Sequence, residues 1–536
     1  MTANGLGYET RWTIRYVLAA LGFLLLTSVE GMMMRTKLVV PDFLTGEHYY
    51  SVMTAHPIVG IFGYAYLAVM GAFYFLIPYL LKTPVYHRRL IPVNFWLQSI
   101  GVLVAWGACY ATDFNSLYTL YWPLPVSFDR VSNLGVVIFI FGIAVVLINV
   151  LLFSYNLFAT LIKREPVEGA EQSRIYTFRD YLKAAFGLDR LFRKREKGAA
   201  GPEEKRLYDT LPVFIVAVAR GTIDTVINAV VLLTAGVLIL VFAVPPLFGL
   251  ASLDPRGVDA LLYKNWFWWG LDMIADGNVL MYAAGVWYLL VPMLVGRKLY
   301  GEALVRTVIL ADLLVSLFVW SHHLMADQPQ PTALRLFSGQ MITSGEILTL
   351  GLTIFATMMT IYLARPVRFT PPLKFVLASM FGFMLGSVAG ITQANFGLNV
   401  VLHNTQWVIG THAHVMLLLG LSPLLFGVVY ALIPLLIGKE VKSPLLVNLH
   451  LVFWIGGSLV MCLAMGWAGL DGMLRRTLYP DGMYLTHMTV AMAGGIMVIV
   501  GFLCLLLNLV LTLGVGTILR VISPFPARQD SLASEA

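Results

Sequence analysis

Two histidines separated by one residue, in the run Gly410-Thr411-His412-Ala413-His414, open a long apolar stretch of this chain. On a helix, residues two apart point to nearly opposite sides. His412 and His414 therefore cannot share one ligand, but they can bind two cofactors on either side of one helix. Imidazole is costly to leave unpaired inside a membrane, so such residues are functional-site hypotheses by default. The alternative is that both imidazoles only hydrogen-bond to neighbouring helices.

The composition indicates a polytopic membrane protein. Of the 536 residues, 59% are hydrophobic and 12% are charged, whereas soluble domains are about 25% charged. The formal net charge of +7 is interpreted as loop charge that sets topology, not as a nucleic-acid-binding surface. The three cysteines, Cys109, Cys462 and Cys504, are isolated and offer no disulfide framework or covalent haem attachment motif.

Apolar segments recur along the whole chain, each close to the roughly 20 residues that span a bilayer. We expect an all-α bundle of about twelve transmembrane helices in one integral membrane domain, residues 1–536. The expected segments are 12–34, 56–81, 91–111, 133–162, 212–243, 266–295, 302–324, 340–364, 373–394, 405–437, 444–470 and 484–514. The first is interpreted as a membrane helix and not as a cleaved signal.

Basic connections alternate with less basic ones along the chain, and the longest basic one is 163–210. We interpret 163–210 as a solvated cytoplasmic loop. Because Lys and Arg are in excess in cytoplasmic loops, both termini are expected in the cytoplasm. One exterior loop breaks the pattern with the adjacent Arg475 and Arg476, which suggests a bound anion.

This orientation brings the polar groups of four segments to one depth, in the outer third of the bilayer. The set comprises His56, Asp272, Asp276, His322, His323, His412 and His414. One such residue could be a helix–helix hydrogen bond. Five of the ten histidines at one depth instead indicate metal binding.

Haem irons take axial imidazoles, and a low-spin haem takes two. One of the two histidines of the tenth segment, together with His56, would make a bis-histidine site. The other would be the single proximal ligand of a second, five-coordinate haem on the opposite face. The sequence thus predicts two haems of undetermined type.

A third metal site is expected at His322, His323 and Asp272. Adjacent residues turn about 100° apart on a helix, so both histidines reach one metal only near a helix end, where the sequence places them. The two-histidine, one-carboxylate set suits non-haem iron better than copper, because a hard carboxylate replaces a softer imidazole. The alternative for Asp272 and Asp276 is a polar pair near the membrane interface.

These residues resemble the catalytic subunit (subunit I) of the haem-copper oxygen and nitric oxide reductase superfamily. The resemblance covers nearly the whole chain and looks closest to the B-type oxidase branch. The similar stretches are Leu117–Tyr121, Asn265–Trp269, Val401–Val408, Trp467–Leu470 and Arg475-Arg476.

The resemblance implies a role for each candidate residue. His56 and His414 match the low-spin haem ligands, and His412 matches the proximal ligand of the high-spin haem. His322 and His323 match two ligands of the second active-site metal.

The resemblance also assigns residues to the haem propionates. Arg475 and Arg476 match the arginines that hold these carboxylates. The propionates would then be the anion inferred from the loop charges. His403 and Asn399 fall on the propionate side, where Asn399 stands at the position of an acid in the family.

The sixth segment departs from the oxygen reductases of this branch. They carry His-Pro-Ile-Val-Tyr, in which the histidine binds copper and the tyrosine is cross-linked to it. Here Asp272 stands at the histidine position and Asp276 at the tyrosine position. Cytochrome-c-dependent nitric oxide reductases have a glutamate and a glycine in the similar window, and Asp276-Gly277 matches that pair.

The chain is therefore expected to be a nitric oxide reductase that converts two nitric oxide molecules to nitrous oxide and water. Asp272 and Asp276 are the expected catalytic carboxylates, with Asp276 as fourth metal ligand or proton donor. The alternatives are a divergent terminal oxygen reductase, a nitric oxide dismutase-like protein, or, in a different class, a transporter or a haem-bearing sensor. The lack of an internal repeat argues against a transporter.

The expected partner subunit is inferred from the electron-entry centre that the chain lacks a motif for. It carries no motif for a copper or haem-c electron-entry centre, so a cupredoxin-like or cytochrome-c-like subunit is expected to deliver electrons. Membrane lipid is the other expected partner, in the cytoplasmic membrane of a prokaryote. Polar groups within membrane segments could belong to proton routes, but they more often bond a neighbouring helix, so no role is assigned to Glu30, Ser338, Thr343, Ser344 and Glu346.

Overall fold

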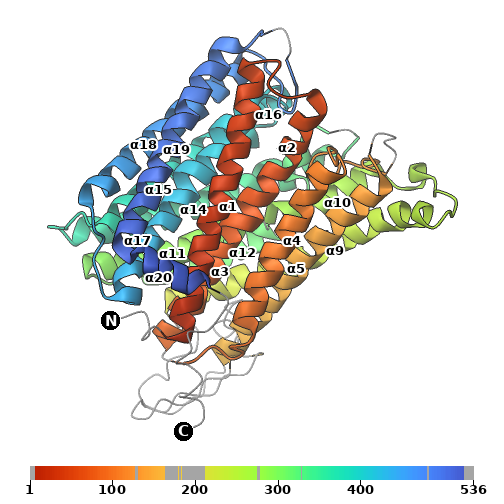
Figure 1. Cartoon of the computed structure of the whole chain (residues 1–536). Helices are drawn as coiled ribbons and strands as arrows, with labels where there is room; N and C mark the ends of the chain where they lie inside the picture. Colours follow the sequence, from red (N-terminus) through yellow and green to blue (C-terminus); the bar gives the residue numbers. More distant parts are fainter. Residues whose placement is uncertain are drawn as a thin grey trace, which may run out of the picture.

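The chain folds into a bundle of long helices that run side by side (Figure 1). This computed structural model describes residues 7–81, 83–126, 131–162, 179, 183, 212–273, 278–327, 329–479 and 482–523. Within those ranges the structure has helices and no strands, apart from one isolated bridge between Thr405 and Leu474. The expected all-α membrane fold is therefore confirmed.

The helices and helical turns have the following bounds, in chain order. They are α1 (Tyr8–Val39), α2 (Gly46–Ile58), η2 (Val59–Tyr66), α3 (Leu67–Leu81), α4 (Leu90–Ala111), α5 (Asn133–Ile162), α9 (Val213–Leu247), η3 (Pro255–Gly257), α10 (Ala260–Asp272), α11 (Asn278–Val295), α12 (Glu302–Ser316), η5 (His322–Leu324), α13 (Thr332–Leu334), η6 (Arg335–Met341), α14 (Ile342–Leu363), α15 (Pro371–Ala394), α16 (Phe396–Leu402), η7 (Val408–Leu421), α17 (Ser422–Ile437), α18 (Pro444–Leu470), α19 (Leu485–Leu513) and α20 (Val515–Ile522).

Ten continuous helical runs of the described residues are long and apolar enough to cross a membrane. They match ten of the expected segments, so the estimate of about twelve was approximate. The described parts of the expected sixth segment belong to α10 and α11, with residues 274–277 outside the described residues, and the seventh is α12 followed by the short turn η5. The α-helix of the seventh segment thus ends at Ser316, before the two histidines.

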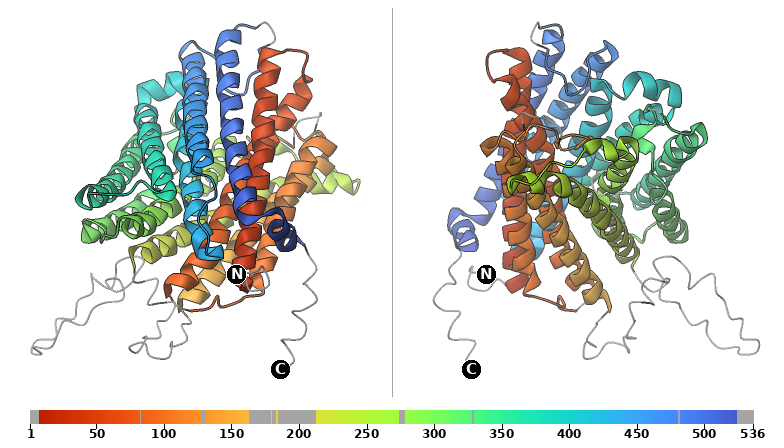
Figure 2. Two further views of the ribbon diagram at one scale, coloured as in Figure 1. Left: turned by 60° about the vertical axis from the view of Figure 1, so that its left-hand side comes forward. Right: turned by 90° about the vertical axis from the view of Figure 1, so that its right-hand side faces the viewer.

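The two ends of the described chain meet at one end of the bundle. Helix α1 (red) lies beside α19 (blue) in Figures 1 and 2. The Arg15 guanidinium donates hydrogen bonds to the carbonyls of Val521 and Ser523 at 2.6 and 2.9 Å, which fixes α20 against α1. The expected basic loop 163–210 lies outside the described residues, except for Arg179 and Lys183.

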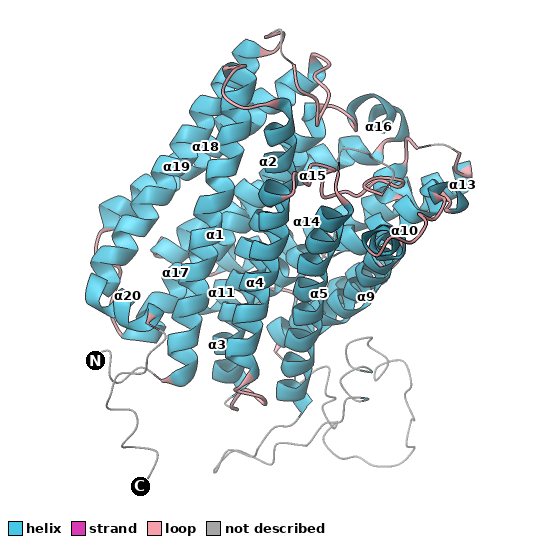
Figure 3. Cartoon of the chain, turned by 45° about the vertical axis from the view of Figure 1, so that its right-hand side comes forward, coloured by secondary structure: helices cyan, strands magenta, loops and turns pink. Residues whose placement is uncertain are grey.

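Longer loops gather at the opposite end of the bundle, near α16 (Figure 3). Two glycines, one in the middle of α15 and one near the end of α18, let neighbouring helices approach η7. A Cβ at Gly382 of α15 would overlap the backbone of Leu419, and a Cβ at Gly469 of α18 would overlap the backbone of Trp407. Because glycine has no side chain, α15 and α18 can pack closely against η7.

Candidate functional site

His412 and His414 lie on η7, which is π-helical. The His414 ring faces the His56 ring of α2, with ring centres 6.3 Å apart and ring planes at 15°. His412 faces the other way, with Nδ1 3.1 Å from the Gly386 carbonyl of α15. The structure thus places the two imidazoles on opposite sides of one helical segment. π-Helical turns are rare and frequently mark functional sites.

The separation of the His56 and His414 rings fits a single metal ion between them. With metal–nitrogen bonds of roughly 2.0 Å on each side, two imidazoles on one ion have ring centres about 6 Å apart. Gly31 of α1 lies against this pair, since a Cβ there would be 3.3 Å from His56 Cε1. The residues present therefore fit a bis-histidine haem.

The three candidate haem ligands share one hydrogen-bonding arrangement. His56 Nδ1 lies 2.9 Å from the Thr27 carbonyl, His414 Nδ1 lies 2.9 Å from the Ile409 carbonyl, and His412 Nδ1 is bonded to Gly386 in the same way. A metal-binding histidine typically donates its other ring N–H to a carbonyl or carboxylate, which fixes the tautomer. In all three rings Nε2 is thereby left as the acceptor nitrogen that can bind iron.

The second metal set is assembled from Asp272, at the end of α10, and from the η5 histidines. The ligand atoms of Asp272, His322 and His323 all lie within 4.8 Å of one another. Asp272 Oδ1 is 2.6 Å from His323 Nε2. Because η5 is a 3₁₀ turn of three residues per turn, its adjacent side chains diverge by about 120°. The ligand atoms of the two imidazoles nevertheless lie close enough to bind one ion, because η5 is a short turn between helices and not part of a regular helix.

This metal set lies on the His412 side of η7. His412 interacts electrostatically with His323 and Asp272, and His322 interacts with His412. The arrangement brings one candidate haem-ligand imidazole and a three-residue candidate metal set together. Asp276, the expected fourth ligand or proton donor, lies outside the described residues.

Arg475 and Arg476 gather basic charge in the loop between α18 and α19. The Arg476 guanidinium lies 5.3 Å from the centre of the Tyr121 ring, and Arg475 Nη2 donates to Asn404 Oδ1 at 3.2 Å. Burial, together with the charge of Arg476, lowers the pKa of Arg475 to about 10. Two adjacent, half-buried cations fit a site for an anionic group such as a haem propionate.

His403 and Asn399 lie at the same end of the bundle. The His403 ring centre is 6.3 Å from that of His323. Burial, reinforced by the charge of Arg475, lowers the pKa of His403 well below its usual range, so this imidazole is neutral near pH 7. Asn399 Nδ2 donates to the Gln393 carbonyl at 2.9 Å, so its amide is engaged within the protein.

Three residues without a role from the sequence pattern adjoin these sites, and Glu30 precedes Gly31, which lies against His56. Thr343 Oγ1 lies 2.8 Å from His322 Nδ1, and Glu346 Oε2 lies 3.5 Å from the same nitrogen. Arg35 interacts electrostatically with His56 and His414 and donates to Met488 Sδ at 3.0 Å. Glu30 accepts hydrogen bonds from Trp106 and Tyr110, each at 2.8 Å. From the sequence, these residues could have been found as charged or polar groups inside membrane segments.

Thr343→Val should weaken the second metal site without affecting the haems. The substitution removes the hydroxyl that holds His322 Nδ1, and loss of such outer partners typically lowers metal affinity by about 10–100-fold. Titration with a chelator, followed by elemental analysis and haem spectroscopy, measures both effects. Thr357→Val is the matched control, because the Thr357 hydroxyl bonds its own helix at Thr353. Equal metal retention in both variants would contradict the assignment.

Comparison with known proteins agrees with this architecture. Residues 11–503 match the family described as cytochrome C and quinol oxidase polypeptide I. The chain is 24% identical over 513 residues to a protein named probable quinol oxidase subunit 1 from Staphylococcus haemolyticus, covering 93% of this chain and 69% of the relative. It is also 24% identical over 510 residues to quinol oxidase subunit 1 of Bacillus subtilis, covering 92% and 70%.

A solved structure shares the fold. A cryo-EM structure of a heme-copper terminal oxidase dimer superimposes with a TM-score of 0.73 at 21% sequence identity. The match covers 97% of this chain and 85% of the other.

Proposed function

The chain belongs to the cytochrome c and quinol oxidase polypeptide I family, and from this premise we propose that it is the catalytic subunit of a terminal reductase that acts on nitric oxide. It is a multi-pass membrane oxidoreductase of the haem-copper superfamily. The substrate, the metal and the electron donor are the parts of this function that we propose.

The histidines would bind two haems and one further metal. His56 and His414 would hold the low-spin haem, and His412 would hold the high-spin haem. His322, His323 and Asp272 would hold a non-haem metal, proposed to be iron in preference to copper because of the carboxylate ligand. When bound, the haems supply electron transfer, and the high-spin haem and the metal together supply gas binding and charge stabilisation.

The observation that carries the nitric oxide proposal is the carboxylate of Asp272, held 2.6 Å from His323. In the oxygen reductases that the chain resembles, a histidine stands there, cross-linked to a tyrosine. The tyrosines that follow in α11 are engaged elsewhere. Tyr282 OH lies 3.4 Å from Thr222 and 3.3 Å from Thr225. Reduction of two nitric oxide molecules needs two electrons and two protons and no tyrosine.

Terminal oxygen reduction is the second candidate. The two relatives described above are called quinol oxidases, and the similar structure is called a terminal oxidase. These comparisons favour the oxygen-reductase alternative over the nitric oxide expectation. The proposal for nitric oxide therefore depends on the metal set itself.

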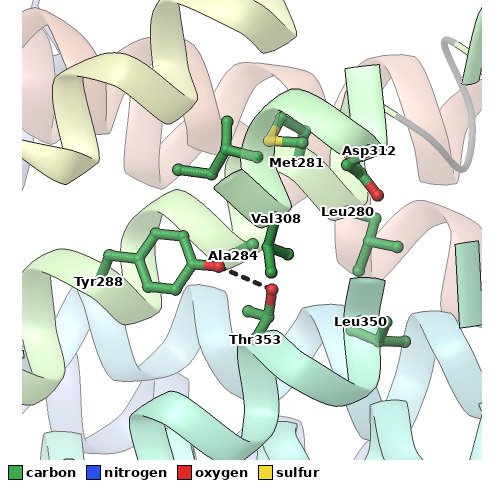
Figure 4. Close-up of a pocket in the computed structure, with 9 residues that line it drawn as sticks. Leu280, Met281, Ala284, Tyr288, Val308, Asp312, Leu350 and Thr353 are labelled. Atoms are coloured by element: carbon green, nitrogen blue, oxygen red, sulfur yellow. Dashed lines mark hydrogen bonds between the residues drawn. The ribbon is translucent and has the colours of Figure 1, made fainter. Parts of the chain in front are cut away.

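Polar groups along α14 could deliver the protons that either reaction consumes. Thr353 Oγ1 lies 2.6 Å from Tyr288 OH (Figure 4). One turn away on α14, Thr349 donates to Asp312 Oδ1 at 2.6 Å. Asp312 and Tyr288 line a cavity of about 10 Å³, which is close to the space of one water molecule. One turn further along α14, Glu346 reaches His322. We infer that these side chains hold and relay protons towards the metal set.

The electron donor and the orientation are proposals as well. A cupredoxin-like or cytochrome-c-like subunit would deliver electrons to the haem between His56 and His414. We place the chain in the cytoplasmic membrane of a prokaryote with both termini in the cytoplasm, since the basic loops require that orientation.

Parallel gas-consumption assays on the purified complex, with one artificial electron donor, test the proposed substrate. We expect nitric oxide to be consumed with release of one nitrous oxide per two molecules, and dioxygen to be consumed slowly. Elemental analysis of the same preparation should show iron beyond the haem irons. Rapid oxygen consumption without nitric oxide consumption would establish the oxygen-reductase candidate instead.

A further inference from the structure

Three charged side chains meet inside the bundle, between α9 and α12. Arg220 and Asp224 lie one turn apart on α9 and are only 0% and 2% exposed. Asp312 of α12 interacts electrostatically with both of them. Ionisable residues inside a membrane span usually face the bundle interior, pair with one another and mark proton pathways. We call Arg220, Asp224 and Asp312 the α9–α12 triad, and none of them belongs to the candidate haem or metal sets.

The charges of the triad do not balance when every member is ionised, because one guanidinium faces two carboxylates. The next cation along α12, Arg306, is paired with Glu302 at 2.6 Å. The other titratable groups that act on the carboxylates are the phenols of Tyr282 and Tyr288 on α11, which are neutral near pH 7. Since an unbalanced charge is costly inside a membrane protein, one of two neighbouring carboxylates takes up a proton instead.

The hydroxyl of Thr349 on α14 accommodates both charge states of Asp312. Thr349 Oγ1 lies 2.6 Å from Asp312 Oδ1 and 2.9 Å from the Glu346 carbonyl. A hydroxyl has one proton to donate, whereas a carbonyl can only accept. Thr349 therefore donates to an ionised Asp312. When Asp312 is protonated, it can donate to Thr349, which then donates to the carbonyl.

Asp224 has a similar arrangement and one oxygen to spare. Ser316 Oγ of α12 lies 3.2 Å from Asp224 Oδ2 and 2.9 Å from the Leu313 carbonyl. The other carboxyl oxygen, Asp224 Oδ1, is buried and has no hydrogen-bond partner among the described residues. A buried oxygen without a partner is more costly when its group is charged, so this oxygen is a second position for the proton.

Asp312 connects the triad with the α14 side chains inferred to relay protons. Asp312 is partly exposed and lines the small cavity of Figure 4 together with Tyr288 and Thr353. The cavity, of about 10 Å³, is close to the space of one water molecule. A water molecule there would lie beside both the carboxyl group and the relay.

We propose that the α9–α12 triad is a proton store, in which Asp224 and Asp312 share one proton and Arg220 balances the remaining negative charge. On release, the proton passes from Asp312 to water in the cavity, and both carboxylates stay ionised until a proton from the cytoplasmic side replaces it. The storage role rests on the proposed relay along α14, whereas the sharing of one proton does not.

Infrared spectroscopy of the purified complex tests the sharing, because the C=O stretch of a carboxylic acid is separate from that of a carboxylate and shifts in heavy water. Asp224→Asn and Asp312→Asn should each remove the signal of one carboxylic acid per chain, since Arg220 then balances the carboxylate that remains. The double variant should remove no more than either single variant. Arg220→Gln should add the signal of one carboxylic acid, because both carboxylates must then be neutral.

Asp254→Asn is the matched control for the infrared signal. Asp254 is exposed and paired with Arg256 at 3.0 Å, so its replacement should leave the carboxylic acid signal unchanged. Haem spectra show whether each variant is assembled. A loss in only one single variant, a loss in neither, or an additive loss in the double variant would overturn the shared proton.

Gas consumption by Asp224→Asn tests the storage role, because this variant keeps every residue of the α14 relay. We expect turnover to fall about tenfold, less than the roughly 10²–10⁴-fold contribution of a direct general acid. Unchanged turnover in a variant that has lost the infrared signal would overturn the storage role. A complex that reduced oxygen and not nitric oxide would leave both tests intact, because both reactions consume protons.

Discussion

Replacing His412 with alanine is expected to remove the high-spin haem, to abolish gas reduction and to leave the low-spin haem in place. His412 is oriented by its hydrogen bond to Gly386 and is the only ligand proposed for that iron. His56 and His414 lie on the other side of η7 and keep their own ring geometry. Haem content should fall from two to one per chain, measured by extraction and by optical spectra of the purified complex.

The reciprocal variant and a control make this prediction specific. His414→Ala should remove the low-spin spectrum while carbon monoxide still binds the remaining haem. His487→Ala should retain both haems, because His487 pairs with Asp471 at 2.9 Å near the outer end of α19. If the high-spin haem survived in His412→Ala, the assignment of the two faces of η7 would be wrong.

Replacing Asp272 with alanine should produce the second large effect, a loss of the non-haem metal with both haems retained. Loss of an outer-shell partner already costs metal sites about 10–100-fold, so loss of a direct ligand should exceed that range. Gas turnover should fall in parallel, because the metal is needed to stabilise charge on the reacting gas. Elemental analysis and turnover assays on one preparation measure both quantities.

Asp272→His extends this prediction to metal identity. It replaces the hard carboxylate with an imidazole, so the preference should move from iron towards copper. The variant should still reduce oxygen poorly, because the tyrosine is not restored. Asp327→Asn is the control, since Asp327 is paired with Lys264 at 3.0 Å and lies outside the metal set. Full metal retention in Asp272→Ala would show that Asp272 is not a ligand.

Much of the fold could be predicted from the sequence because the bilayer imposes a simple rule. Each crossing needs a long apolar run, and in lipid the backbone must satisfy its own hydrogen bonds. Ten of the twelve expected segments are therefore continuous helices. The spacing of His412 and His414 also determined that they would serve different partners, since residues two apart diverge in any helix of this kind.

Local sequence could not show the irregular turns that shape the site. The π-helical η7 and the 3₁₀ turn η5 are defined by which carbonyl accepts the hydrogen bond of each N–H. Packing against neighbouring helices influences these hydrogen bonds. The early end of α12 has the same origin. A hydrophobic pattern reports which side chains avoid water, and it carries no record of these hydrogen bonds.

The partners of His56, His322 and His412 were decided by the tertiary structure, whereas His414 bonds Ile409 within its own helical segment. Thr343 is 21 residues from His322 in the chain, and Thr27 is 29 residues from His56. The sequence by itself predicted the ligand types and a common depth for them, because membrane burial restricts where histidine and aspartate can be kept. Only packing across helices could decide which carbonyl, hydroxyl or carboxylate orients His56, His322, His323 and His412, since those contacts join residues that no local pattern connects.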